Sequence, residues 1–343
     1  MRNTKKKYAA VRRRALALLL ALTALFAAAC RADPAKEEGD PSGADTPRIR
    51  YRYAEKEEGQ ALLLSNNAYF DGLCENDLDY RMQKKGATRE EFKTYAAEQI
   101  REFSKMDRRL IDRCFAQMEE TLAARGVELP LPEEIVLIKT TAAEEGFASG
   151  YTHGTQIYLR DLYIMGLHSA GESQIRQMTE MLWHELFHCL TRSSSEFREK
   201  MYGIIRFTVH PEEFTVPMSV LPRFVSNPDV EHHNATAVFR IGGQDVACWL
   251  AAVTAKPFEQ PGDRMSNGMT AVLVPADGRD LSFALEEAEN LYDVFGKNTR
   301  YLIDPEECLA DNFSYAMLFG HEGRATPLPT QELLDAILTA LTP

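Results

Sequence analysis

The stretch that most constrains this chain is 183–189, which carries the pattern H-E-x-x-H inside a segment with helical spacing of apolar residues. On a helix, side chains four positions apart lie on one face, so His184 and His188 can present two imidazole nitrogens to one metal ion. Glu185 lies beside the pair, in a position to take a proton from a metal-bound water. The segment therefore predicts a helix with an apolar side and a metal-binding side.

A second acidic stretch lies far downstream. Asp304 and Pro305 are typical of an N-cap and a first helical residue. In the helix expected to follow, Glu307 and Asp311 are four positions apart and share a face. One alternative stays open for Glu307, because its spacing from Asp304 also fits a capping box. In that case Glu306 would be the replacement metal ligand.

Together the two stretches resemble the gluzincins, the zinc peptidases of the thermolysin and neprilysin type. Their pattern is H-E-x-x-H on one helix and E-x-x-[SA]-D on a later helix, and the resemblance covers mainly the parts of the chain around these two stretches. It implies that His184, His188 and Glu307 bind Zn²⁺, leaving one position open for water. It also implies that Glu185 is the general base and that Asp311 orients a ligand histidine. A metzincin would need a third histidine six residues after the motif, where this chain has a serine.

The resemblance also implies an α+β fold of the zincin type, with a small mixed sheet, an active-site helix and a ligand helix. In gluzincins a strand just before the active-site helix forms the sheet edge above the metal, and residues 149–159 are similar to that stretch. An extended peptide adds to such an edge through main-chain hydrogen bonds. The family adds a tyrosine or histidine that hydrogen-bonds the oxyanion. The candidates here are Tyr301, Tyr315, His321, His232 and His233.

The first part of the chain is typical of an export signal. Residues 1–29 contain a basic region followed by an apolar run that is short for a membrane span, which favours a signal peptide. The run ends in Ala-Ala-Ala-Cys, similar to a bacterial lipoprotein cleavage box, so we expect lipid on Cys30. The protein would then be a membrane-anchored lipoprotein of the bacterial cell surface or periplasm. Because Ala27 stands where leucine is commoner, cleavage without lipidation, which would release a secreted protein, stays open.

Patterning divides the rest of the chain into five parts. Residues 30–60 are expected to hold the lipidated cysteine and a flexible linker, and residues 61–127 a helical region. Residues 128–206 hold the catalytic part with the H-E-x-x-H helix, and residues 207–280 an inserted β-rich subdomain. Residues 281–343 form a helical part with the third zinc ligand. Finer patterns predict strands at 134–139, 239–241, 246–250 and 271–274 and helices at 281–295 and 330–341.

Charge and cysteine content exclude some classes. Removing residues 1–29 takes away seven positive and no negative charges, so the formal charge changes from −12 to −19. An acidic body of this kind repels phosphate backbones, which argues against nucleic acid as a partner. After Cys30, five cysteines remain without a regular framework, so no disulfide scaffold is expected.

Three functions fit these observations. The first is a zinc peptidase that acts on a peptide or protein substrate through a metal-activated water. The second is a metal-binding pseudoenzyme, and the third is a non-catalytic lipoprotein binding module whose motif is accidental. Glu185 favours the first, because a structural metal site has no open position for a base to serve.

Overall fold

The computed structural model describes residues 48–168, 171–321 and 328–342. The expected signal peptide and Cys30 lie outside this part of the chain. The expected linker is wrong at its C-terminal end, because residues 51–53 pair in a sheet and a helix begins at Lys56. In the described residues, no helix is long and apolar enough to cross a membrane.

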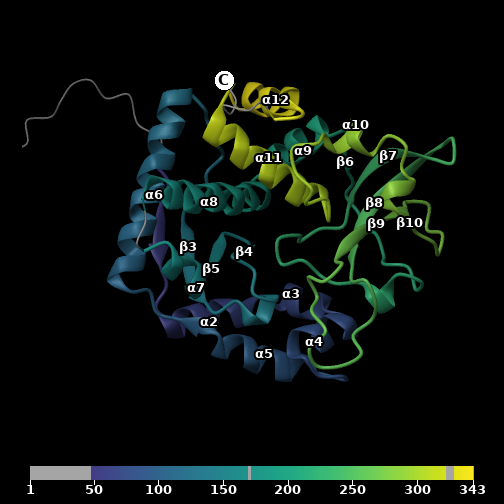
Figure 1. The fold of residues 1–343 in the computed structure, drawn as a ribbon, viewed down its shortest axis with the longest axis horizontal. Helices are drawn as coiled ribbons and strands as arrows, with labels where there is room; N and C mark the ends of the chain where they lie inside the picture. The colour runs from purple at the N-terminus through teal and green to yellow at the C-terminus, as the bar shows by residue number, and fades with distance from the viewer. Residues whose placement is uncertain (1–47, 169–170, 322–327, 343) are drawn as a thin grey trace, which may run out of the picture. The chain divides into compact units, whose positions relative to one another are not determined.

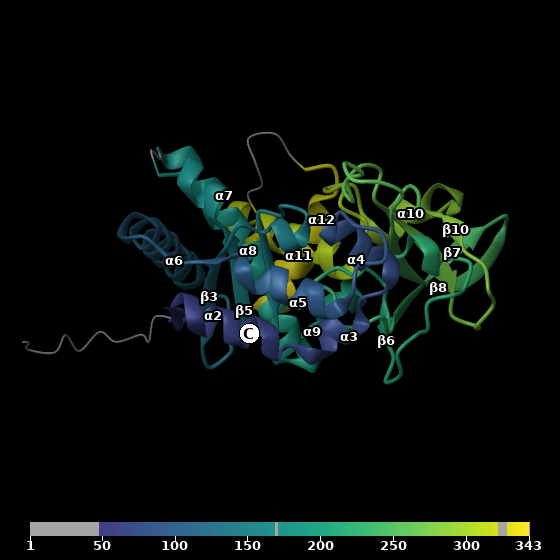
Figure 2. The same cartoon turned by 90° about the horizontal axis from the view of Figure 1, so that it is seen from below.

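Two five-stranded sheets and the helices around them make up a mixed α+β fold (Figures 1 and 2). The first sheet has the order β1-β3-β5-β4, with β2 also pairing with β3. Its strands are β1 (Tyr51–Tyr53), β2 (Ile100–Arg101), β3 (Ile135–Thr140), β4 (Gly150–His153) and β5 (Gln156–Arg160). The second sheet is antiparallel, with the order β10-β9-β8-β7-β6. Its strands are β6 (Thr208–Val209), β7 (Ala235–Ile241), β8 (Gln244–Val253), β9 (Thr270–Pro275) and β10 (Phe283–Ala284).

The helices precede, separate and follow these sheets. Those before the metal-binding motif are α2 (Lys56–Ser65), α3 (Asn67–Gly72), α4 (Glu75–Met82), α5 (Arg89–Glu98), α6 (Lys105–Arg125) and α7 (Asp161–Gly166). Those that carry the motif or follow it are α8 (Glu172–Ser193), α9 (Ser195–Ile204), α10 (Leu291–Phe295), α11 (Pro305–Phe319) and α12 (Gln331–Leu341).

Alternating side chains of β3 place the first sheet between two groups of helices. Ile135 and Leu137 pack in the large core with α6, α8 and α11, while Val136 and Ile138 pack with α2, α3 and α5. Successive strand side chains point to opposite faces, so this apolar run serves both layers. Figure 1 shows α8 above β4 and alongside α11, with the second sheet at the far side of the fold from α6.

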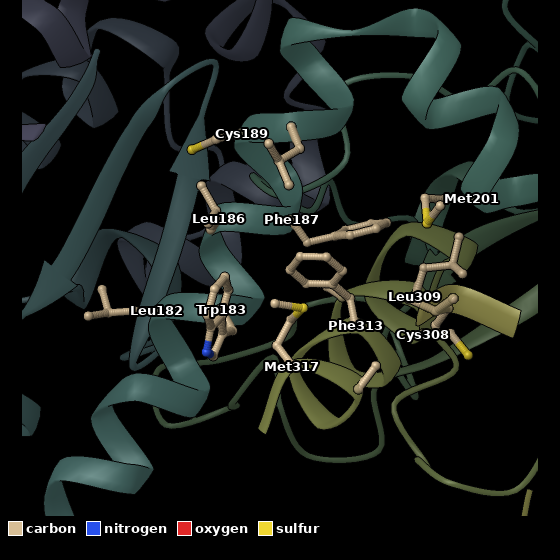
Figure 3. Packing of buried hydrophobic residues seen from close by; sticks show 14 of the residues in the cluster. Leu182, Trp183, Leu186, Phe187, Cys189, Met201, Cys308, Leu309, Phe313 and Met317 are labelled. Carbon is tan, nitrogen blue, oxygen red and sulfur yellow. The ribbon is translucent and has the colours of Figure 1, made fainter. Parts of the chain in front are cut away.

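Aromatic packing holds the two helices that carry the predicted ligands together (Figure 3). Trp183 and Phe187 of α8 lie with their ring centroids 5.9 and 5.4 Å from that of Phe313 on α11. All three side chains are fully buried. His184 and His188 directly follow Trp183 and Phe187, so their side chains point about 100° away from this packed face of α8.

The strands predicted around 134–139, 239–241, 246–250 and 271–274 are present, and β7 and β8 pair as an antiparallel hairpin. The helix predicted over 281–295 is wrong for most of its length. That segment holds β10, a short 3₁₀ turn and only then α10. Phe283 pairs with Leu273 of β9, so tertiary strand pairing overrides the local helical pattern.

Candidate metal centre

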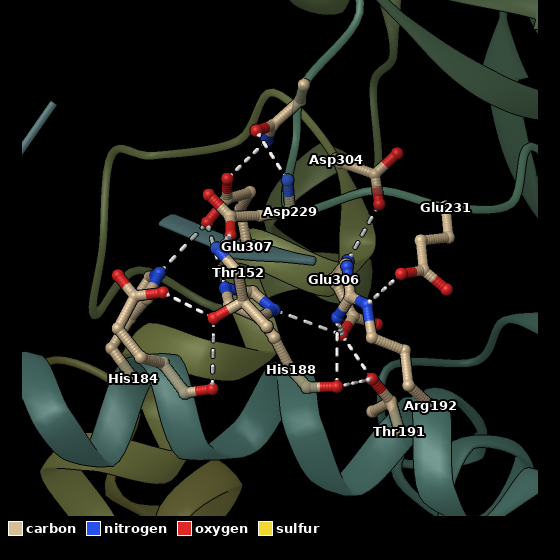
Figure 4. A network of polar contacts seen from close by, with 12 residues as sticks. Thr152, His184, His188, Thr191, Arg192, Asp229, Glu231, Asp304, Glu306 and Glu307 are labelled. Atoms are coloured by element: carbon tan, nitrogen blue, oxygen red, sulfur yellow. Dashed lines mark hydrogen bonds and ion pairs between the residues drawn. The ribbon is translucent and has the colours of Figure 1, made fainter. Parts of the chain in front are cut away.

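Side chains from α8 and α11 converge at one point (Figure 4). Nε2 of His184 lies 3.0 Å from Oε2 of Glu307, and Nε2 of His188 lies 3.7 Å from the same oxygen. Ligand atoms about 2.1 Å from a tetrahedral zinc lie roughly 3.4 Å apart. These three residues, which lie far apart in the sequence, therefore form a buried group that could hold a metal ion.

Hydrogen bonds on the outer side of each imidazole fix which nitrogen faces this point. Nδ1 of His184 lies 3.0 Å from Oδ1 of Asp311, whose other oxygen accepts from Thr299 at 2.5 Å. A carboxylate accepts only, so Nδ1 donates and a neutral ring keeps its lone pair at Nε2. That lone pair faces the Glu307 carboxylate, an arrangement that is repulsive unless a proton or a metal ion lies between them. Asp311 is thus placed where the sequence analysis expected it.

Glu306 orients the second imidazole. Its Oε1 accepts from Nδ1 of His188 at 3.1 Å and from Thr191 at 2.5 Å, and its Oε2 accepts from Tyr202 at 2.7 Å. Nε2 of His188 is buried and has no hydrogen-bond partner among the described residues. A buried nitrogen of this kind is costly without a partner, and a metal ion would supply one. The donor set therefore fits a catalytic zinc.

These contacts correct two alternatives. Glu306 is not placed as a replacement ligand, because a neighbouring helical residue points about 100° away and reaches the outer nitrogen of His188 instead. The capping box is also wrong, because Asp304 accepts from the backbone N–H of Glu306 at 2.9 Å, whereas the Glu307 carboxylate lies at the histidines.

Glu185 is buried beside the two histidines. Its Oε2 accepts from the Thr152 hydroxyl at 2.8 Å, which ties the base to β4. Burial raises the pKa of Glu185, and the charges of the two histidines oppose that rise. A Cβ on Gly150 would lie only 2.7 Å from Oε1 of Glu185, so any larger residue there would displace the Glu185 carboxylate. The only sequence signal for Gly150 is a glycine at the start of a strand pattern.

Two further polar side chains, those of Asn227 and Asp229, come from the loop before β7. Neither was predicted as a site residue from the sequence. The Asn227 amide donates to Oε1 of Glu307. Oδ1 of Asp229 accepts from the backbone N–H of Thr152 at 2.6 Å, and its carboxylate lies within 4.8 Å of ligand atoms of Glu185 and His188. Burial and the charges of Glu185 and Glu307 raise the pKa of Asp229. An Asn-Pro-Asp turn carries no periodic signal that could have found them.

Tyr301 is the one oxyanion candidate that lines the cavity at this site. It is 38% exposed, and burial of its hydroxyl with the nearby charges of Glu307 and Asp229 raises its pKa. The other candidates lie elsewhere. His232 pairs with Glu213, His233 packs between Phe224 and Trp249, His321 pairs with Asp335, and Tyr315 packs near Phe319 on α11.

A cavity of about 740 Å³ opens at the centre. Its floor is α8, one wall is the segment 145–150 leading into β4, and the other wall includes residues 225–229 and the β8–β9 connection. This volume is in the range of small-molecule and cofactor sites.

Comparisons with known proteins found no relative of this chain. No family model matches the chain, and no curated protein or solved structure matches it. The chemistry of the site therefore rests on its own residues.

The structure also limits the expected role of the sheet edge. The edge strand is β4, not β5, which pairs on both sides. On β4, two of the outward N–H groups are already taken. Thr152 donates to Asp229, and Gly154, just after the strand, donates to Oε1 of Glu231 at 2.7 Å. A peptide could add to this edge only around Gly150.

Proposed function

We propose that this chain is a zinc-dependent peptidase that hydrolyses peptide bonds with Glu185 as the general base. The observation that carries the proposal is the unpartnered, buried Nε2 of His188, which faces the same point as Nε2 of His184 and Oε2 of Glu307. A structural site would use four protein ligands, whereas three ligands with a carboxylate base beside them are typical of metal-assisted hydrolysis.

When bound, zinc lowers the pKa of its water and polarises the scissile carbonyl. His184, His188 and Glu307 would hold the ion. The Thr152 hydroxyl holds Oε2 of Glu185, which leaves Oε1 to accept a proton. The water oxygen bonds to the acyl carbon, the C–N bond breaks, and the proton held by Glu185 passes to the leaving amine. Tyr301 is the candidate donor to the oxyanion.

The proposal also covers the substrate, a peptide, and the location of the protein, outside the cytoplasm. The cleft between residues 145–150 and residues 225–229 suits an extended chain, and the resemblance to gluzincins points the same way. The leader and Cys30 favour a lipid-anchored protein outside the cytoplasm of a bacterium. Metabolic labelling with a fatty acid, lost in Cys30→Ala, tests the anchor.

Zinc content and peptide cleavage together test the function. The purified chain should bind zinc in a 1:1 ratio and cleave members of a peptide library. His184→Ala should lose the zinc, whereas Glu185→Gln should keep it and lose cleavage by at least about 10³-fold. Glu172→Gln, at the exposed start of the same helix, is the matched control and should match wild type. Cleavage by Glu185→Gln at the wild-type rate would refute the mechanism.

A pseudoenzyme would bind zinc and cleave nothing, so the same experiment separates it. A binding module with an accidental motif would show neither stoichiometric zinc nor any change in His184→Ala. Zinc content and peptide cleavage of wild type and His184→Ala therefore decide between the two alternatives.

A further inference from the structure

Residues 227–231, below called the strap, close one end of the sheet edge at the metal centre. Asp229 and Glu231 occupy the outward N–H groups of Thr152 and Gly154 at 2.6 and 2.7 Å. Because β5 pairs along the other side of β4, these carboxylates stand where a further strand would pair. Beyond Gly150, an extended peptide therefore cannot pair with the outward N–H groups of Thr152 and Gly154, which these carboxylates occupy.

The strap is tied to both ligand helices. Oε1 of Glu231 lies 3.1 Å from Nε of Arg192, one turn beyond His188 on α8, and Arg192 also donates to the His188 carbonyl at 2.9 Å. Asn227 donates to Glu307 on α11 and accepts from the backbone N–H of Asp229 at 3.1 Å. These contacts hold the strap beside the metal ligands (Figure 4).

The cavity lies on the opposite side of this closure. The α8 residues that line it run from Gln177 to Glu185, and the turn with His188 and Arg192 is not part of its lining. From β4 and the segment before it, the lining runs from Glu145 to Gly150 and stops there. The cleft is therefore open towards the start of α8 and ends at the metal centre.

We infer that the chain acts on the amino terminus of its substrate, as an aminopeptidase, with Asp229 as the acceptor for the α-ammonium group. This inference rests on the proposed function, since it names the substrate class of that site. In a peptide cut after its first residue, the α-nitrogen is two bonds from the scissile carbonyl carbon, about 2.5 Å away. An acceptor for it must then lie within roughly 5 Å of that carbon. The Asp229 carboxylate lies within 4.8 Å of ligand atoms of Glu185 and His188, the proposed base and a proposed zinc ligand, which the scissile bond must approach.

The charges at the closed end of the cleft decide which terminus of a peptide substrate can bind there. Asp229, Glu231 and Glu185 place three carboxylates there. Arg192 is already paired with Glu231 and lies 3.5 Å from Glu306. Arg81, which lines the cavity, is paired with Asp77 and Glu145. A substrate carboxylate would face these acids, whereas an ammonium group would supply the positive charge that the buried Asp229 lacks.

Paired substrates test the inference on the zinc-loaded full chain. One synthetic hexapeptide is offered with a free amino terminus and with an N-acetyl group, and the products are followed by mass spectrometry. We expect removal of residues from the free terminus, and a fall in kcat/KM of about 10- to 100-fold on acetylation. Asp229→Asn, which keeps a carbonyl for the Thr152 N–H, should lower kcat/KM for the free peptide by a similar factor. Glu213→Gln, a carboxylate that pairs with exposed His232, is the control and should change nothing.

Binding gives a second measurement that does not depend on turnover. In zinc-loaded Glu185→Gln, calorimetry should show the free peptide binding about tenfold more tightly than the acetylated one. Adding Asp229→Asn should remove that difference. Cleavage of the acetylated peptide at internal bonds as fast as the free peptide would overturn this inference alone. A zinc-loaded chain that cleaves neither peptide would instead overturn the proposed function, and this inference with it.

Discussion

Nδ1 of His188 lies 3.1 Å from Oε1 of Glu306, and this contact decides which face of the imidazole meets the metal centre. Since the carboxylate accepts the Nδ1 proton, the unpartnered Nε2 is the basic nitrogen. Glu306 stands next to Glu307 in the chain, yet the two carboxylates serve opposite sides of the same ring. One helical turn thus supplies both a candidate ligand, Glu307, and the group that orients another, His188.

Replacing Glu306 with glutamine should weaken zinc binding. The variant loses the negative charge that strengthens the basicity of His188, and such outer partners are worth about 10- to 100-fold in metal affinity. Competition with a chromophoric chelator measures the change. Glu199→Gln on the exposed side of α9 should retain wild-type affinity. Equal zinc affinity in both variants would show that Glu306 does not raise the zinc affinity of this site.

Replacing Gly150 with alanine should lower activity without loss of zinc. The new Cβ would lie 2.7 Å from Oε1 of Glu185 and 3.0 Å from Sδ of Met181, so the base must move. A displacement of about 1 Å in a catalytic group costs on the order of 10²-fold in kcat. Steady-state peptide cleavage and zinc content are measured together. Gly166→Ala, where a Cβ meets nothing within 4 Å, should behave as wild type; a normal kcat in Gly150→Ala would contradict this account.

Replacing Phe313 with alanine should destabilise the fold by about 3–5 kcal/mol. Its ring lies against Trp183 and Phe187, so truncation leaves a cavity between the two ligand helices. Urea unfolding followed by circular dichroism gives the free energy of unfolding. Tyr292→Ala, at a 54% exposed ring, should cost less than about 1 kcal/mol. A similar loss in the two variants would mean that α8 and α11 are not held by this packing.

Stability should fall as the pH rises through the range in which Glu144 ionises. Burial raises the pKa of Glu144 to about 7, while its Oε1 accepts from Thr140 and Tyr151. Between about pH 4.5 and 7 the folded chain keeps this proton and the unfolded chain releases it. The free energy of unfolding therefore drops across that window, by up to about 3 kcal/mol, and levels off above it.

The matched variant for this prediction is Glu144→Gln, which cannot ionise. Urea unfolding between pH 5 and 8 should show wild type losing stability relative to the variant as the pH rises. Parallel pH profiles for the two proteins would place the pKa of Glu144 near its ordinary value.

Much of the candidate metal centre could be predicted because the information for it is local in the sequence. The spacing of His184 and His188 fixes their shared helix face, and the spacing of Glu307 and Asp311 does the same on α11. The strands of the β7–β8 hairpin follow from their own composition and from the glycines between them. The helix predicted over 281–295 fails for the opposite reason, since β10 forms only by pairing with β9.

The sequence by itself determined which side chains share a helix face and so which of them can meet one metal ion. Only the tertiary structure decided that Glu306 orients His188, that Gly150 lies against the Glu185 carboxylate, and that Asp229 and Glu231 close the β4 edge. These contacts join residues that lie 35 to 118 positions apart, or that meet only after two elements have packed. Sequence periodicity does not predict such contacts, because the distance between two packed elements is set by all the side chains between them.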